Sequence, residues 1–229
     1  MADQISKPLD QVRRELLAEF DDAERESYIH LVDWLRKSDV VSHALQVGDT
    51  APDFLLPDEN GRLHSSKDLR DEGPLVVSFY RGGWCPFCKA ELRALQAITA
   101  DLNRLKAKVV VLSPDTRDLP RQLKQQLGLD LTMLADVDYG VATTYGIVFR
   151  VPDETRAHYA DFGYDLGHRH GSTEWMLPIP ATYLIDQDGV VRGAFIEPDF
   201  TIRQEPSDIL ARVGQLAESR AGDDSASDD

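Results

Sequence analysis

The chain has 229 residues, 42% of them hydrophobic, and its 25 basic and 40 acidic side chains give a formal net charge of -15. This length suits one globular domain with additional elements, and the negative charge disfavours binding to nucleic acid or to anionic membranes because their phosphate groups would be repelled. The sequence has no apolar run of about 18 residues that would predict a transmembrane helix, and the polar N-terminus has no signal-peptide or lipidation motif, so we expect a cytoplasmic protein.

Residues 1–45 are predicted to form a helical extension. Hydrophobic residues recur at helical spacing within 9–20 and again within 28–35, and Asp21 and Asp22 can cap the break between the two segments. The pattern leaves open whether these helices pack on the rest of the chain or on a second copy, which would make the protein a homodimer.

Residues 46–217 have the pattern of an α/β domain, in which short apolar runs predict buried strands and longer periodic segments predict helices. An early strand-helix-strand unit predicts parallel strands, and the turn Asp186-Gln187-Asp188-Gly189 predicts a late antiparallel hairpin. The fold class is therefore α/β, with a central mixed β-sheet flanked by helices. The strands are expected at 75–80, 108–113, 131–134, 181–185 and 190–196, and the helices at 85–105, 116–127, 139–145 and from Pro206 onward.

The two cysteines, Cys85 and Cys88, lie three residues apart in Trp84-Cys85-Pro86-Phe87-Cys88, where the strand predicted at 75–80 passes into a helix. The free N–H groups and the dipole of a helix N-terminus favour a thiolate, so the pKa should fall below about 8.5. Pro86 suits the first helical position, where no N–H is needed. At this spacing both sulfurs lie on one face and can form a disulfide, so the pair is predicted to be a redox-active dithiol.

Neighbouring residues support this site. Arg81 and Lys89 place positive charge near the sulfurs, and Trp84 is expected to pack beside them. Glu91, further along the predicted helix, could accept a proton from the sulfurs, but an exposed helix charge is the expectation. Pro180 directly precedes a predicted strand, where a cis bond would present a backbone edge to an extended substrate.

Two other roles fit the cysteines less well. His168 and His170 could complete a zinc site with them, but a His-x-His pair on a polar loop is usually solvated, and zinc sites normally show a second tight ligand cluster. Inert buried thiols rarely lie at a helix N-terminus beside glycines. We therefore expect neither a metal nor a cofactor.

Two segments lack a regular pattern. Residues 151–175 are rich in His, Tyr, Gly and Asp and are predicted to be irregular, and from their length we expect them to overhang the cysteines and influence substrate choice. Residues 218–229, which end in Gly-Asp-Asp-Ser-Ala-Ser-Asp-Asp, are predicted to be a disordered acidic tail.

Three segments carry a family resemblance, and they are Val47-Gly48-Asp49-Thr50-Ala51-Pro52-Asp53-Phe54, Phe79-Tyr80-Arg81-Gly82-Gly83-Trp84-Cys85-Pro86-Phe87-Cys88 and Pro180-Ala181-Thr182-Tyr183-Leu184-Ile185-Asp186. Together they resemble the peroxiredoxin-like branch of the alkyl hydroperoxide reductase/thiol-specific antioxidant family, within the thioredoxin superfamily. The resemblance covers about residues 46–215 and excludes the N-terminal helices. It implies a thioredoxin-like fold, a hydroperoxide substrate and a dithiol that thioredoxin or a similar donor recycles.

The chain departs from the family pattern around the cysteines. Peroxiredoxins usually carry Phe-Tyr-Pro-x-x-Phe-Thr-x-x-Cys, in which the last cysteine attacks peroxide. In this register that cysteine is Cys88, the threonine is Cys85 and the proline is Arg81, while a family arginine falls on Pro180. The threonine and arginine that polarise a bound peroxide are thus absent from their usual places, whereas Trp-Cys-x-x-Cys and the proposed cis-proline are similar to thioredoxin.

Two assignments of the nucleophile stay open. The thioredoxin pattern selects Cys85, exposed at the helix cap, with Cys88 resolving. The peroxiredoxin register selects Cys88, with Cys85 resolving and Arg81 stabilising an anion.

Three functions are consistent with these residues. The first is a thiol-dependent peroxidase, in which one cysteine is oxidised by a hydroperoxide and the other condenses with it. The second is a dithiol–disulfide reductase that acts on a protein or small-molecule disulfide. The third is a non-catalytic redox-sensing or binding module that dimerises through residues 9–45.

Overall fold

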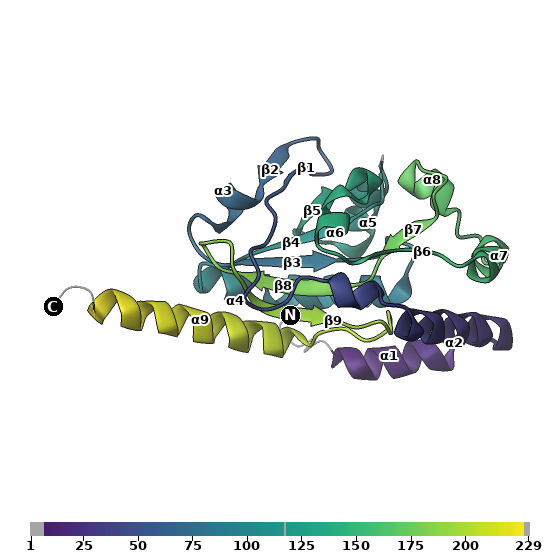
Figure 1. Ribbon diagram of the computed structural model, residues 1–229, viewed down its shortest axis with the longest axis horizontal. Coiled ribbons are helices and arrows are strands. Elements are labelled where there is room, and N and C mark those ends of the chain that lie inside the picture. The colour runs from purple at the N-terminus through teal and green to yellow at the C-terminus, as the bar shows by residue number, and fades with distance from the viewer. Residues whose placement is uncertain (1–6, 117, 227–229) are drawn as a thin grey trace.

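The computed structural model describes residues 7–116 and 118–226, which form a five-stranded sheet with helices packed around it (Figure 1). The strands of the sheet are β3 (Leu75–Phe79), β4 (Lys108–Ser113), β5 (Thr132–Ala135), β8 (Ala181–Ile185) and β9 (Val191–Ile196). Their order is β5-β4-β3-β8-β9, in which β3, β4 and β5 are parallel and β8 and β9 are antiparallel to their neighbours. The predicted mixed sheet is confirmed.

The remaining elements connect and cover this sheet. Two pairs of short strands lie outside it, β1 (Leu55–Pro57) with β2 (Leu63–Ser65) and β6 (Val148–Arg150) with β7 (Met176–Pro178). The α-helices are α1 (Leu9–Ala18), α2 (Asp22–Lys37), α3 (Ser66–Arg70), α4 (Pro86–Arg104), α5 (Leu119–Leu127), α6 (Gly140–Thr144), α7 (Asp153–Asp161), α8 (Leu166–His170) and α9 (Pro206–Ala226). Short 3-10 helices occupy Val40–His43 and Val137–Tyr139.

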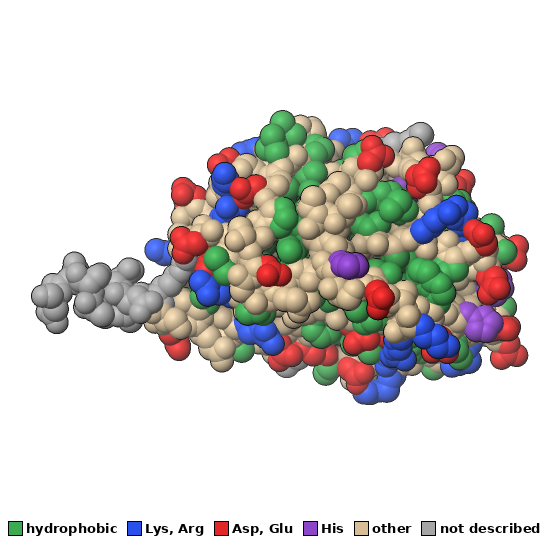
Figure 2. All heavy atoms as spheres, viewed as in Figure 1, with side chains coloured by type: hydrophobic (Ala, Val, Ile, Leu, Met, Phe, Trp, Pro, Cys, Tyr) green, Lys and Arg blue, Asp and Glu red, His purple; other side chains and the backbone are tan. Residues whose placement is uncertain are grey.

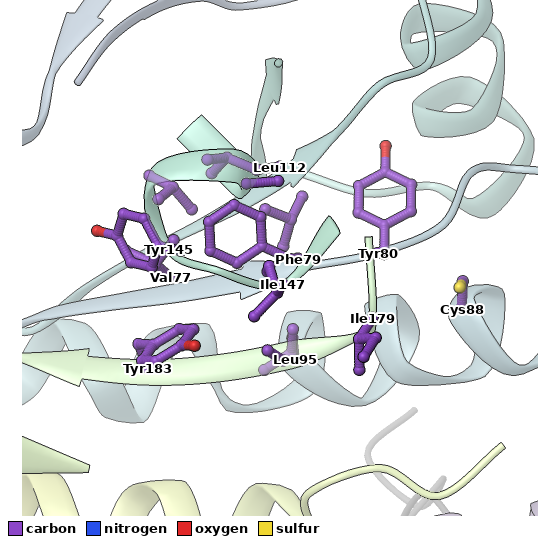
Figure 3. Packing of buried hydrophobic residues seen from close by; sticks show 14 of the residues in the cluster. Val77, Phe79, Tyr80, Cys88, Leu95, Leu112, Tyr145, Ile147, Ile179 and Tyr183 are labelled. Carbon is purple, nitrogen blue, oxygen red and sulfur yellow. The ribbon is translucent and has the colours of Figure 1, made fainter. Parts of the chain in front are cut away.

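Strand β3 lies at the centre of the sheet and is buried along its whole length. The Phe79 ring packs against Tyr145 with ring centroids 5.0 Å apart, whereas the adjacent Ser78 hydroxyl lies 3.5 Å from the Glu91 carboxylate of α4. The strand thus joins two halves of the core, and Figure 3 shows Cys88 on helix α4 beyond the end of this packed region. The burial of both faces explains why the sequence of β3 is nearly continuous in apolar residues.

Helices α1 and α2 pack on the chain's own domain, against α4 and α7 respectively. Asp21 caps α2 through a reciprocal capping box with Glu24, as its position predicted. The two helices are tied to the loop before α9, where buried Asp199 accepts hydrogen bonds from Tyr28 Oη at 2.8 Å and Arg13 Nη2 at 3.2 Å. The Glu205 carboxylate accepts the first two backbone N–H groups of α1.

The segment predicted to be irregular contains regular structure, so that expectation is wrong. Residues 151–175 include helices α7 and α8. Helix α7 buries only Thr155 and Tyr159, one turn apart, and therefore has no aliphatic stripe that the sequence could reveal. Helix α9 continues to Ala226, within the segment 218–229 that was predicted to be a disordered tail. Extending an existing helix costs little once its first turns are packed. Residues 227–229 of that predicted tail lie outside the described residues.

The surface carries mixed charge, and Figure 2 shows acidic, basic and hydrophobic side chains interspersed on the face that it presents. Within residues 7–116 and 118–226, no helix is both long and apolar enough to cross a membrane.

The anchoring of the N-terminal helices predicts a stability effect. Asp199→Ala should lower the free energy of unfolding by about 1–2 kcal/mol, because Tyr28 and the partly exposed Arg13 would lose a buried, charged acceptor. Urea denaturation followed by circular dichroism measures this change. Asp33→Ala, at an exposed position of α2, is the control and should change the value by less than about 0.5 kcal/mol. Equal effects of the two variants would contradict the anchoring role.

Candidate active site

The two cysteines open helix α4, directly after the loop that follows β3. Cys85 is the N-cap residue and Pro86 is the first helical residue, as the sequence predicted. Asp115 fixes the loop, because its Oδ2 accepts a hydrogen bond from the Gly83 backbone N–H at 2.6 Å. Gly82 has a φ of +143°, and a Cβ there would lie 2.7 Å from Trp84 Cδ1, so only glycine fits under this indole ring.

Both cysteines are free thiols, and both are buried. Cys85 is 1% exposed and Cys88 is 0% exposed, so the expectation that Cys85 is exposed at the helix cap is wrong. The cap itself is not the cause of this burial. Helices α1 and α2 and the aromatic side chains around α7 cover the end of α4, and their position could not be inferred from the local motif.

Arg81 places a buried guanidinium beside the sulfurs. Its Cζ atom lies 3.9 Å from the Phe200 ring centroid and 4.7 Å from that of Trp84, and its Nη2 donates a hydrogen bond to Tyr159 Oη. Among the ion pairs of the described residues, none includes Arg81, and its Nε has no hydrogen-bond partner. Burial by itself lowers the pKa of Arg81, but Tyr159 and the two sulfurs outweigh it and raise the pKa. The thiol pair is therefore one source of negative charge for this cation.

A second arginine, Arg203, lies behind Cys88. Arg203 Nη2 is 3.3 Å from Cys88 Sγ, and Arg203 Nε donates to Glu91 Oε2 at 2.8 Å. Glu91 is 3% exposed, so the expectation of an exposed helix charge is wrong. The reason is that α9 and its preceding loop pack over this face of α4. Burial raises the pKa of Glu91 to about 7, even though Arg203 opposes the shift.

The two sulfurs differ in their acidity. Burial by itself raises the pKa of Cys85, but the hydrogen bond from Cys88 and the charges of Arg81 and Arg203 outweigh it and lower the pKa to about 5. Burial, the hydrogen bond to Cys85 and the Cys85 charge raise the pKa of Cys88 well above its usual value. The pair therefore titrates as a unit, and its surroundings favour the negative charge on Cys85 and the proton on Cys88.

A pocket of about 240 Å³ lies over Cys85, and Cys88 is not among the residues that line it. One wall comes from the N-terminal segment, the start of α4 and the loop before α9, where Phe20, Tyr28, Phe87 and Phe200 form successive edge-to-face contacts with ring centroids 5.7–6.2 Å apart. Cys85 is thus the sulfur that a bound molecule would meet.

The opposite wall of the pocket comes from the segment around α7. Trp84, Tyr159, Phe162 and Tyr164 pack together there, with the Trp84 and Tyr164 ring centroids 4.8 Å apart. The expected overhang of residues 151–175 above the cysteines is therefore present, although its contacting residues come from a helix and the turn after it.

Two predicted neighbours do not join the site. Pro180 is buried next to β8, does not line the pocket, and follows a trans peptide bond, so the predicted cis bond is wrong. The chain after Pro180 is extended and pairs with β3 as strand β8, and no cis bond is present there. Lys89 is not among the charges that lower the pKa of Cys85.

Sequence reasoning missed Arg203, which is 115 residues from Cys88 and lies in no motif. The arginine missing from its family position thus has two counterparts beside the sulfurs, Arg81 and Arg203. His170, one of the two histidines of the zinc alternative, is buried away from the cysteines. Its Nδ1 shares a hydrogen bond with Tyr139 Oη at 2.8 Å. Across the described parts of the chain, no three His, Cys, Asp or Glu side chains are grouped to hold a metal ion.

Sequence comparison identifies relatives of this chain. The model of the AhpC/TSA family matches residues 47–194. A putative peroxiredoxin bcp of Coxiella burnetii is 25% identical over 170 residues, which are 74% of this chain and 99% of that protein. The thiol-disulfide oxidoreductase ResA of Bacillus anthracis is 24% identical over 148 residues, 64% of this chain and 68% of that protein.

Solved structures share the fold. Peroxidoxin BcpB from Mycobacterium tuberculosis superposes with a TM-score of 0.59 at 21% identity, over 75% of this chain and 98% of that one. A peroxiredoxin-like protein from Aquifex aeolicus has a TM-score of 0.60 at 18% identity, over 76% and 88% of the two chains. The predicted thioredoxin-like fold is confirmed.

The acidity of Cys85 predicts a pH profile for its alkylation. The rate of modification by iodoacetamide should stay nearly constant between about pH 8 and pH 6 and fall only around the pKa of about 5, because the thiolate is the reactive form. Mass spectrometry of the modified peptide measures this rate. In Arg81→Met the midpoint should move to higher pH because a cation is lost, whereas in the control Lys89→Met it should not move. A rate that climbs continuously up to about pH 8.5 in the wild type would contradict the assignment.

Proposed function

The chain belongs to the AhpC/TSA family, and we propose that it is a thiol peroxidase in which Cys85 attacks a hydroperoxide and Cys88 resolves the product. The observation that carries this proposal is the position of the two sulfurs, since Cys85 lines the pocket and Cys88 lies behind it. The low pKa of Cys85 supports the same division of roles. This assignment follows the thioredoxin pattern and departs from the peroxiredoxin register, which would select Cys88.

In the first step, the Cys85 thiolate attacks the outer oxygen of the hydroperoxide and the O–O bond breaks. The leaving oxygen takes up a proton and departs as an alcohol or as water, and Cys85 is left as a sulfenic acid. The Arg81 guanidinium lines the same pocket and can stabilise the negative charge that develops on the leaving oxygen.

In the second step, the Cys88 sulfur attacks the Cys85 sulfur. The S–O bond breaks, the hydroxyl group leaves as water with the proton of Cys88, and a disulfide forms. An external dithiol of the thioredoxin type then reduces this disulfide and is itself oxidised, so that each cycle transfers two electrons to one hydroperoxide.

Glu91 acts on Cys88 through Arg203, which contacts both of them. When Glu91 is ionised it neutralises Arg203, and when it is protonated the guanidinium charge acts fully on the sulfur. Glu91 is thus a positioning residue that tunes the resolving cysteine, and its raised pKa places this change near neutral pH.

Residues 46–217 would be the catalytic domain, with residues 1–45 as an extension that contributes pocket walls from α1 and α2. A chain with two cysteines kept as a free pair suits the reducing conditions of the cytoplasm, where we place it. The homodimer stays a prediction that light scattering can test.

Disulfide reduction is the second candidate function, and the match to ResA favours it. The burial of Cys85, at 1% exposure, favours small or extended disulfides over those inside folded proteins, because the disulfide must enter the pocket to reach the sulfur. Reduction of insulin disulfides in excess of the uncatalysed rate would support this function over the peroxidase.

The peroxidase proposal predicts different products from the two cysteine variants. After hydrogen peroxide is added, the wild type should form the Cys85–Cys88 disulfide, Cys88→Ser should stop at a sulfenic acid on Cys85, and Cys85→Ser should lose at least about a thousandfold in peroxidase rate. Mass spectrometry with a sulfenic-acid trap identifies each species. A sulfenic acid on Cys88 in Cys85→Ser, at the wild-type rate, would reverse the roles. Unchanged rates in both variants would rule out the peroxidase and would favour the third function, a non-catalytic redox-sensing or binding module.

The Glu91 carboxylate predicts a pH dependence of the resolving step. In the wild type, the rate of disulfide formation should change around pH 7, because Glu91 loses its proton there and then offsets the charge of Arg203. Glu91→Gln should abolish this inflection while the first step keeps its rate within about threefold. Stopped-flow tryptophan fluorescence separates the two steps. An inflection that persists in Glu91→Gln would assign it to another group.

A further inference from the structure

We propose that the pocket over Cys85 selects uncharged organic hydroperoxides with a compact, ring-sized apolar group, and that helices α1 and α2 and the turn between them, which holds Phe20, contribute to this selectivity. The inference rests on the peroxidase function proposed above and adds the substrate class and the residues that choose it.

The walls of the pocket are suited to an apolar ring. Phe20 and Tyr28 in one wall and Trp84 and Tyr164 in the other line the same pocket as Cys85. Aromatic walls favour the burial of an apolar group and stack against a planar one. Hydrogen peroxide has no such group, and it would gain nothing from these walls.

The volume of the pocket limits the size of the substrate. A cavity of about 150 Å³ in another protein is large enough to bind benzene. The pocket here, at about 240 Å³, therefore has room for a substituted benzene ring with a short side chain. It is too small for the whole of a long acyl chain.

Charge around the pocket disfavours anionic substrates. Glu19 and Glu24 both line it, and the negative charge of Glu24 helps to raise the pKa of Tyr164 on the opposite wall. The cation in the lining is Arg81, whose charge already acts on the Cys85 thiolate. Its unpartnered, buried Nε leaves one N–H for the oxygen of a hydroperoxide. A carboxylate would meet the glutamates before it reached this group.

One wall of the pocket comes from outside the part that this chain shares with its family, and the other from within it. The family match begins at residue 47 and ends at residue 194, whereas Leu16, Phe20, Tyr28 and Phe200 lie outside it and line the pocket. Asp199, next to Phe200, accepts the hydrogen bond from Tyr28 and so holds this wall in place.

The test compares kcat/KM for cumene hydroperoxide, hydrogen peroxide and linoleic acid hydroperoxide in the wild type and two variants. The wild type should prefer cumene hydroperoxide to each of the others by at least about tenfold. Phe20→Ala should reduce the ratio of cumene hydroperoxide to hydrogen peroxide at least about fivefold, because it removes one aromatic wall. Ile29→Ala is the matched control, since Ile29 is 46% exposed on α2 and does not line the pocket, and it should keep the wild-type ratio.

A binding measurement keeps the inference testable if Phe20→Ala does not fold. The product alcohol 2-phenyl-2-propanol should inhibit reduction of hydrogen peroxide competitively, whereas benzoate, which has a ring and a negative charge, should inhibit at least about tenfold more weakly.

The outcomes separate this inference from the function on which it rests. If the wild type reduces hydrogen peroxide as well as cumene hydroperoxide, or if benzoate inhibits as strongly as the alcohol, the substrate class is wrong while the peroxidase stands. If the wild type reduces no hydroperoxide at all, both are wrong.

Discussion

The site depends on the buried guanidinium of Arg81, which has a thiol pair in place of a carboxylate as its counter-charge. Two arginines and one glutamate are buried around the sulfurs, and Arg203 already pairs with Glu91. When Glu91 is ionised, one positive charge is left over, and an isolated charge in such surroundings is costly. A thiolate on Cys85 balances it. The low pKa of Cys85 is therefore a property of the whole buried cluster, to which the helix N-terminus adds its own contribution.

This cluster can exist because the chain closes over it. Helices α1 and α2 fold back on α4 and α7, and the loop before α9 contributes Phe200 and Arg203 to the same region. Without this cover the sulfurs and both arginines would face water, where charges are screened and a guanidinium shifts the pKa of a thiol far less. The same cover forms the pocket, so substrate access and thiol activation depend on one set of contacts.

The two cysteines share one helix terminus but have distinct surroundings. Cys85 meets the pocket, whereas Cys88 lies beneath it between the Arg81 backbone N–H and the Arg203 guanidinium. This difference in access favours Cys85 as the nucleophile, a choice that the motif alone left open. The two sulfurs are nevertheless close enough for each to shift the pKa of the other, as disulfide formation between them requires.

The sequence by itself determined the features that are local. Continuous apolar runs identified the buried strands, and Pro86 after a cysteine located the start of α4, because burial and helix capping leave their pattern in neighbouring residues. Tertiary structure alone decided that Glu91 is buried and that Arg203 contacts Cys88. Their partners lie more than a hundred residues away, and contacts over such separations leave no periodic trace in the chain. The walls of the pocket and the helix α7 were determined in the same way, by packing and not by local sequence.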